Sequence, residues 1–224
     1  MRADALARCE AEESAASIRC FGGFGFPDVL RADSYASQRW VWAKQHSCWQ
    51  PAADAAAELL PRRRAALRLG PVVRMSFVVS EGAIMALERG MGDPGVAVAQ
   101  MRHLRDLIDE LAPCVRILHV GTRLLSAPGP AFTIVTDRAG RETLFVETLT
   151  PNDFMRVRDD RRVSDFARHF AELSDVSGDQ SGSRARIGTA IQHCEQILTG
   201  LPDAVSPAAT DGSRYSWGRS TVRR

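Results

Sequence analysis

The sequence predicts an α+β fold in which a small, mostly antiparallel sheet with a hairpin packs against several helices. Residues 73–79 place apolar side chains at every second position, which is the period of a half-buried strand. Residues 93–111 open with Asp-Pro, a typical helix start, and then carry an apolar stripe at helical spacing. Residues 131–147 contain two strand-like stretches around a turn-rich segment, and they predict the hairpin.

The N-terminal part of the chain predicts a helix, a strand and a tight turn. Residues 1–17 are rich in alanine and glutamate, and they lead into an alternating stretch at 17–21. The glycine-rich sequence FGGFGF follows. It lacks both the GxGxxG spacing of a dinucleotide loop and the lysine of a P-loop, so a turn is the favoured interpretation.

The other elements follow from the same periodicities and from the usual end signals of helices and strands. Pro61 interrupts one helical segment, and its missing N–H predicts a kink there. The expected elements are one or two short helices in 28–45, a helix over 51–69, a short helix at 81–87, a strand at 115–120, and two C-terminal helices at 164–173 and 183–198 separated by a loop at 176–182.

A single domain accounts for most of the chain, whose 224 residues are enough for one generous core. We expect residues 1–13 to be a helical lead-in, residues 14–199 to form the domain and residues 200–224 to be a flexible tail. The tail is predicted because its composition is small, polar and proline-bearing.

Charge and cysteine content argue against several classes of protein. The 29 Lys and Arg against 27 Asp and Glu leave a net charge of +2, so direct DNA binding is not expected. The 5 cysteines are scattered without a CxxC pair, which argues against a disulfide framework and fits a reducing cytoplasm. No apolar run approaches the roughly 18 residues of a membrane span, so membrane anchoring is not expected either.

Signatures of the common cofactor-dependent enzymes are missing from the sequence. GxSxG, HExxH, Walker and Rossmann patterns are all absent, so we expect no cofactor. His46 and Cys48 form an HxC pair, but a metal site needs three or four ligands and no others can be nominated, so we expect no metal. Cys114 has no identifiable base beside it and is expected to be an inert, hydrophobic thiol.

Two carboxylates stand at the ends of predicted strands and are candidates for acid or base chemistry. Glu81 follows one strand and opens a turn, while Glu147 closes the second strand of the hairpin. If the two lay close together, their repulsion would raise one pKa and supply a catalytic acid or base. The simpler interpretation, which we favour, is that Glu81 caps a helix and Glu147 is exposed or paired with an arginine.

His119 and Arg123 are candidates for a ligand pocket. His119 lies inside a predicted strand, between Leu118 and Val120, and Arg123 follows in the loop GTRLL. A histidine that lines a pocket and an arginine that faces an acidic ligand would suit each other. A partly buried, hydrogen-bonded structural histidine is the commoner alternative.

Several stretches, taken in order, resemble a domain of unknown function found C-terminal to a xenobiotic-response-element-type helix-turn-helix in actinomycete regulators, some of which are called antitoxin-like. Together they span about residues 14–198. The stretches are AASIRCFGGFGFPDVLRADSYA, RMSFVVSEGAIMAL, GVAVAQMRHLRDLIDELAPCVRILHV, PAFTIVTDRAGRETLFVETLT and DDRRVSDFARHFAEL. The resemblance implies the effector half of such a regulator, and the few residues before Ala15 predict that the helix-turn-helix itself is absent.

The chain departs from that family at its opening segment and in its tryptophans. DVLRADSYA stands where the family has a leucine-rich segment containing Gln-Thr, and Trp40, Trp42 and Trp49 cluster where the family has no such concentration. The tryptophans either line a changed ligand pocket or fill core space, and the second interpretation is the simpler one. With His119 and Arg123, they are the candidate ligand-binding residues.

Two functions remain as hypotheses from the sequence. The first is a stand-alone regulatory or ligand-sensing module, with a small molecule or a regulatory protein as partner and a homodimer left open. The second is a cofactor-free cyclase, isomerase or dehydratase recruited into a secondary-metabolite pathway, for which Glu81, Glu147 and His119 are the catalytic candidates. A shaped apolar pocket with a few polar groups would serve either one.

Overall fold

The computed structural model describes residues 2–45, 50–68, 73–111, 114–122, 129–148 and 153–200. Within these ranges, helices separate the first three strands, three more strands then follow in succession, and two long helices come last. The elements are α1 (Arg2–Glu13), β1 (Ala15–Phe21), the 3₁₀ helix η1 (Asp28–Leu30), α2 (Asp33–Lys44), α3 (Gln50–Leu67), β2 (Arg74–Ser80), α4 (Glu81–Glu88), α5 (Pro94–Leu111), β3 (Cys114–Leu118), β4 (Phe132–Asp137), β5 (Glu142–Glu147), β6 (Phe154–Val157), α6 (Asp160–Val176) and α7 (Gln180–Gly200).

The strands form one mixed sheet in the order β3-β2-β1-β4-β5-β6. β1 pairs in parallel with β2, and β2 pairs in parallel with β3, whereas the pairs β1–β4, β4–β5 and β5–β6 are antiparallel. The expectation of a mostly antiparallel sheet was therefore wrong. Its cause is topological: helices separate β1 from β2 and β2 from β3, and such crossovers bring the chain back to the same end of the sheet.

The predicted hairpin is confirmed as β4 and β5. Its turn is held by the Asp137 carboxylate, which accepts hydrogen bonds from the N–H groups of Ala139 and Arg141, while Gly140 takes a positive φ of 81°. β6, which the sequence analysis missed, is only four residues long. So short a strand gives too few positions for a period of two to stand out.

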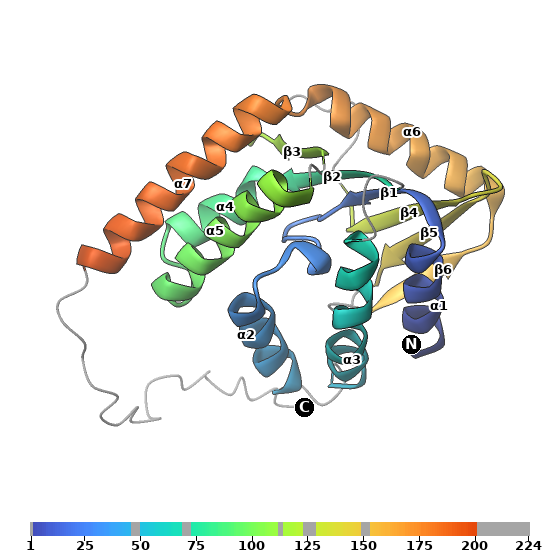
Figure 1. Cartoon of the computed structure of the whole chain (residues 1–224), viewed down its shortest axis with the longest axis horizontal. Coiled ribbons are helices and arrows are strands. Elements are labelled where there is room, and N and C mark those ends of the chain that lie inside the picture. The colour runs from blue at the N-terminus through green and yellow to red at the C-terminus, as the bar shows by residue number, and fades with distance from the viewer. Residues whose placement is uncertain are drawn as a thin grey trace, which may run out of the picture.

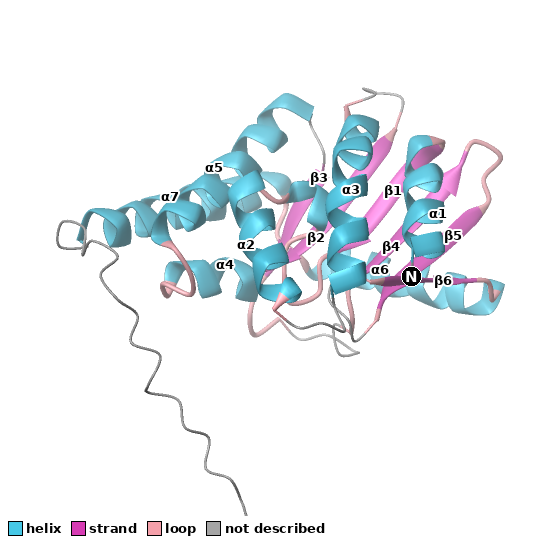
Figure 2. Ribbon diagram, turned by 90° about the horizontal axis from the view of Figure 1, so that it is seen from below, coloured by secondary structure: helices cyan, strands magenta, loops and turns pink. Residues whose placement is uncertain are grey.

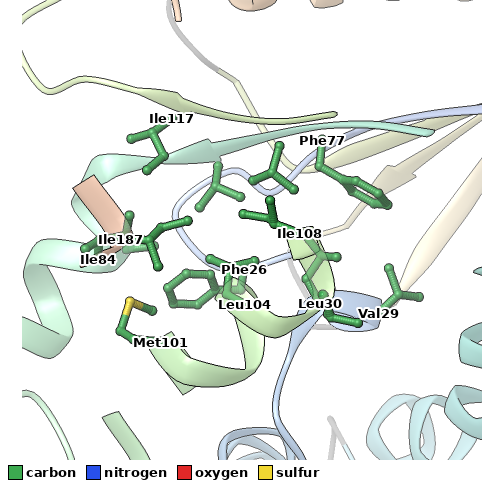
Figure 3. Packing of buried hydrophobic residues seen from close by; sticks show 14 of the residues in the cluster. Phe26, Val29, Leu30, Phe77, Ile84, Met101, Leu104, Ile108, Ile117 and Ile187 are labelled. Carbon is green, nitrogen blue, oxygen red and sulfur yellow. The ribbon is translucent and has the colours of Figure 1, made fainter. Parts of the chain in front are cut away.

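Helices cover both faces of the sheet, and each face has its own hydrophobic core. Figure 1 shows α6 on one face and α1, α3 and α5 on the other, and Figure 2 shows the second group in front of the strands. The larger core packs side chains of β1, β2 and β3 against η1, α5 and α7, as Figure 3 shows for Phe77, Ile117 and Met101. The smaller core joins the opposite face to α6 through Phe132 and Phe170, among others.

Helix starts follow the expected capping chemistry. Asp93 Oδ1 accepts from the N–H groups of Gly95 and Val96 at the start of α5, and Asp159 caps α6 in the same way. In the part of the chain that the structure describes, no helix is long and apolar enough to span a bilayer.

The β3 edge of the sheet is closed by the turn between α6 and α7. The backbone N–H of Ile117 donates to Ser183 Oγ at 3.0 Å, and the N–H of Gly178 donates to the Ile117 carbonyl, also at 3.0 Å. Backbone groups that an edge strand would leave open are thereby satisfied. This closure places the first turns of α7 beside the carboxyl ends of β2 and β3.

Candidate functional site

Glu81 and His119, both predicted as site residues, lie together at the carboxyl ends of β2 and β3. These strands are parallel neighbours with Ser80 opposite Leu118, so the next residue of each emerges at the same edge of the sheet. Glu81 Oε2 lies 3.3 Å from His119 Nδ1 and accepts from the backbone N–H of Val120 at 3.0 Å. The carboxylate therefore orients the imidazole.

The same carboxylate belongs to a longer ionic network that connects α4 with α7. Arg186 Nε donates to Glu81 Oε1 at 2.7 Å, and its two terminal nitrogens donate to Glu88 at 2.8 and 2.6 Å. His193 Nδ1 lies 3.2 Å from Glu88 Oε1. We call the row His119, Glu81, Arg186, Glu88 and His193 the outer network.

Arginine contacts keep both glutamates of the outer network ionised. Burial opposes the charge of Glu81, but hydrogen bonds from Arg186, Val120 and His119 outweigh it and lower its pKa. The hydrogen bonds from Arg186 are the main reason why the pKa of Glu88 is lowered as well. A carboxyl group with a lowered pKa is a poor general acid at neutral pH, so the chemistry open to Glu81 is to position His119.

Gly178 leaves the room that the His119 ring occupies. A Cβ atom built on Gly178 would lie 3.1 Å from His119 Nε2, which is tighter than an ordinary contact. The imidazole is thus enclosed by Glu81 at Nδ1 and by the α6–α7 turn near Nε2, although 44% of the side chain remains exposed.

Glu147 does not share a site with Glu81. It ends β5, and β1 and β4 lie between β2 and β5 in the sheet. Strands lie about 4.8 Å apart, so three steps across the sheet separate the two positions by roughly 14 Å. Instead, Glu147 lies near Arg31, where its charge favours the ionised guanidinium while burial lowers the pKa of that arginine.

The structure describes only two of the predicted aromatic and arginine ligands, Trp40 and Trp42. Trp40 is half-buried and packs against the larger hydrophobic core, as the core-filling interpretation predicts. Trp42 lies in α2. Trp49 and Arg123 lie outside the described residues, as do His46 and Cys48.

A second group of charged residues, which the sequence analysis did not find, is buried beneath α1. Glu12 receives hydrogen bonds from Arg8 Nε at 3.0 Å and from Arg63 Nε and Nη2 at 2.6 and 2.9 Å. Asp28 is bound by both terminal nitrogens of Arg63 and by Arg8 Nη2 at 3.4 Å. Arg8 Nη2 also donates to Thr133 Oγ1 at 2.9 Å. These residues, Arg8, Glu12, Asp28, Arg63 and Thr133, are called the buried cluster below.

Every ionisable member of the buried cluster with a resolved shift is held in its charged form. Burial opposes the ionisation of Asp28, but Arg63 and Arg8 overcome it and hold its pKa far below the ordinary range. Burial likewise acts against the charge of Arg63, while Asp28 and Glu12 raise its pKa well above the usual value. The charges are therefore mutually dependent, and loss of one leaves its partners buried without compensation.

A narrow cavity without room for a water molecule adjoins the buried cluster. Its remaining walls are apolar or weakly polar, and Val29 and Phe77, two of them, are visible in Figure 3. Arg8 lines it and is only 3% exposed, yet its Nη1 has no hydrogen-bond partner among the described residues. The Arg8 guanidinium carbon lies 3.9 Å from the ring centroid of Phe154 in β6, a cation–π contact.

Cys20 also lines this cavity but is not suited to nucleophilic chemistry. It is fully buried, and burial raises its pKa to about 11. Thr133 Oγ1 donates to its sulfur at 3.3 Å. A thiol with such a pKa stays protonated at neutral pH, so Cys20 acts as a small, weakly polar wall.

The chain matches one known protein family. Residues 5–189 match the family described as Domain of unknown function (DUF5753). The chain belongs to this family. No curated protein and no solved structure matches it.

The DUF5753 match includes the whole buried cluster and most of the outer network. His193 alone among the residues of these two groups lies beyond residue 189. Among the described residues of this DUF5753 chain, no group of three or more His, Cys, Asp or Glu side chains could hold a metal ion. The chemistry of both groups thus rests on arginine, carboxylate and imidazole.

One weak signal in the sequence could have pointed to the buried cluster. Arg8 and Glu12 stand four residues apart, and such a pair usually lies on a solvated helix face. Their neighbours Ala7 and Ala11 are small, and Cys9 is wholly buried, so the helix comes close to the sheet. Close approach of α1 is what buries the pair.

Proposed function

We propose that this DUF5753 chain is a regulatory module that senses a small molecule and acts through a partner chain rather than by binding DNA itself. The observation that supports this most directly is the buried cluster beneath α1, in which Arg8 is 3% exposed and its Nη1 has no hydrogen-bond partner among the described residues. Buried ion pairs contribute little net stability compared with well-packed apolar side chains. Such an arrangement suits the selective recognition of a polar group.

The buried cluster also offers a physical link from a ligand to the rest of the molecule. It connects α1 to η1, α3 and β4, which come from three distant parts of the chain. Arg8 extends the link to β6 through Phe154. A ligand that binds Arg8 better in one position of α1 than in another would shift the population towards that position.

The proposed context is that of the regulators that the sequence resembles. In actinomycete helix-turn-helix proteins of this kind, the domain is the part that does not read DNA, and a cytoplasmic location belongs to the same proposal. The nearly balanced charge of +2 supports indirect action, because DNA-binding domains usually carry a concentrated basic surface. The partner chain would carry out the regulatory action.

The experiment is ligand capture followed by identification. Purified protein is incubated with a small-molecule extract of the cells that make it, and binding is followed by thermal shift and native mass spectrometry. A sensed ligand should raise the melting temperature by mass action and be recovered unchanged. If no compound is retained and the melting temperature does not move, the sensing proposal is wrong.

The contact between Glu81 and His119 favours a second candidate, a cofactor-free enzyme such as a cyclase, isomerase or dehydratase. An ionised glutamate that holds Nδ1 of a histidine leaves Nε2 for proton transfer. The same capture experiment distinguishes the two candidates, because an enzyme returns a chemically converted compound. His119→Asn should then abolish conversion while the compound still binds.

A further inference from the structure

We infer that an open groove on the sheet face partly covered by α6 binds a small hydroxylated carboxylate, held through its carboxylate group by Arg74. The groove has a volume of about 420 Å³ and is lined by residues of β1, β2, β4 and β5. This volume lies within the usual range of small-molecule sites. The groove lies on the opposite side of the sheet from the buried cluster, so the inference does not depend on the proposed sensing function.

The groove opens because α6 covers only one half of this face. Phe21, Val78 and Phe132, at the carboxyl ends of β1 and β2 and the start of β4, belong to the smaller core that α6 closes. Ser17 and Arg74 lie opposite each other four residues earlier in β1 and β2. At 3.3 Å per residue, they are about 13 Å away from that core along the strands. This half of the face is therefore left to the solvent or to a ligand.

Small hydroxyl side chains form the floor of the groove, and longer charged side chains form its rim. Ser17 in β1 lies opposite Thr136 in β4, and Ser76 in β2 belongs to the same lining. Arg74 and Glu142 end this row of residues on its two sides, roughly 14 Å apart at about 4.8 Å per strand. Hydroxyl groups both donate and accept hydrogen bonds, so the floor suits a ligand with hydroxyl groups of its own.

Arg74 supplies the positive charge that the groove does not balance itself. Arg19 forms an ion pair with Glu142, whereas the exposed Arg74 side chain has no ion pair or hydrogen bond among the described residues. Two arginines against one carboxylate leave the lining with one net positive charge. A guanidinium group forms paired hydrogen bonds with a carboxylate, whose single negative charge balances this excess. A phosphate monoester, with about −1.5 to −2 charges, would exceed it.

The arrangement of the lining sets the orientation of the ligand. Its carboxylate binds Arg74 at the β2 side, and its hydroxylated chain crosses Ser17 and Thr136 towards the pair of Arg19 and Glu142 at the β5 side. The groove is open to water, so each hydrogen bond to the ligand replaces one to water and contributes only modestly. We therefore expect a Kd of about 1 mM.

Four probes with six-carbon chains test this chemistry in the full chain. Gluconate carries a carboxylate and hydroxyl groups, sorbitol carries hydroxyl groups alone, hexanoate carries a carboxylate alone, and sorbitol 6-phosphate carries a phosphate in place of the carboxylate. Binding is followed at constant ionic strength by NMR of the backbone amides of Ser17, Arg74 and Thr136. Gluconate should give saturable shifts, and sorbitol and hexanoate should bind about fivefold more weakly or worse. Sorbitol 6-phosphate should also bind more weakly than gluconate.

Three variants show whether gluconate binds at Arg74. Arg74→Gln removes the charge-assisted hydrogen bonds and should raise the Kd about tenfold or more. Arg156→Gln is the matched control, because Arg156 is an exposed strand arginine that does not line the groove, and its loss changes the net charge equally. Glu142→Gln should lower the Kd, since it releases Arg19 for the ligand. Melting temperatures check that each variant keeps its fold.

Each result decides the inference. Saturable binding of gluconate that Arg74→Gln weakens and Arg156→Gln leaves unchanged would support it. It would be overturned by the absence of saturable gluconate shifts, by equal effects of the two arginine variants, or by sorbitol, hexanoate or sorbitol 6-phosphate binding as tightly as gluconate. The sensing proposal is decided separately, by whether the protein retains a compound from the cell extract.

Discussion

The buried cluster and the outer network have the same chemistry at different depths. In each, one arginine bridges two carboxylates: Arg63 between Glu12 and Asp28, and Arg186 between Glu81 and Glu88. The side chains of Arg63 and Glu12 are 5% and 4% exposed, whereas those of Arg186 and Glu81 are 17% and 16% exposed. Water can partly replace a lost partner only in the outer network, so equivalent substitutions should differ in cost.

Arg63→Ala should have the largest effect on the free energy of unfolding. It leaves Glu12 and Asp28 buried with Arg8 as their main cationic partner, and breaking a buried pair costs about 3–5 kcal/mol. Urea denaturation measures the loss. The neighbouring Arg62→Ala removes an exposed pair with Glu13 and should change the free energy of unfolding little. Equal costs for the two variants would show that burial does not govern the cluster.

Arg186→Met should destabilise the protein less, by about 1–3 kcal/mol, since Glu81 and Glu88 remain partly hydrated after the loss. Arg184→Ala in the same helix is the control, because its pair with Asp109 is well exposed. Chemical denaturation of both variants gives the comparison. A loss for Arg186→Met as large as that for Arg63→Ala would contradict the difference between the two groups.

Acidification should weaken both groups in the same direction. The pKa values of Asp28, Glu81 and Glu88 are lowered in the folded protein, so their stabilisation is present above the ordinary carboxyl range of about 4 and is lost as the pH falls towards the folded pKa. Each group contributes a slope of at most about 1.4 kcal/mol per pH unit.

The two groups should differ in how far down the pH scale this loss extends. Asp28→Asn should remove the part of the fall in unfolding free energy that lies at the lowest pH. Glu88→Gln should remove a part that lies at higher pH, because the pKa of Asp28 is lowered further than that of Glu88. Unfolding curves measured at a series of pH values test this. Identical profiles for the two variants would mean that Asp28 is not held by the arginines as its contacts indicate.

The sequence named Glu81 and His119 of the outer network, although not as a pair, and no member of the buried cluster; the reason is geometric. Glu81 and His119 each follow a strand whose pattern was recognised, and adjacent parallel strands bring such residues together. What remained hidden was the order of the strands, which places β1 and β4 between Glu81 and Glu147. Periodicity identifies strands but does not order them.

The buried cluster could not be predicted because no local pattern records it. Its members come from α1, η1, α3 and β4, and Arg8 and Thr133 are 125 positions apart in the chain. Arg8 and Glu12 look like a solvated pair until the helix is docked on the sheet. The mixed topology was missed for the same reason, since pairing partners are set by tertiary contacts rather than by the strands themselves.

Two glycines near the outer network give the smallest expected effects and the sharpest local test. Gly178→Ala would place a methyl group 3.1 Å from His119 Nε2, so the ring should shift away from Gly178 and its contact with Glu81 should change, at a cost of up to about 1 kcal/mol. Gly188 lies inside α7 with no atom within 4 Å of an added Cβ, so Gly188→Ala should stabilise the helix by about 0.5–1 kcal/mol.

Melting temperatures and the NMR chemical shifts of the His119 ring distinguish these two effects. Only Gly178→Ala should alter the ring shifts, because Gly188 does not adjoin the ring. Unaltered ring shifts in Gly178→Ala would mean that the turn moves instead of the histidine. In that case the α6–α7 turn deforms more easily than the Glu81–His119 contact. A histidine held so firmly would strengthen the case for His119 as a positioned proton carrier.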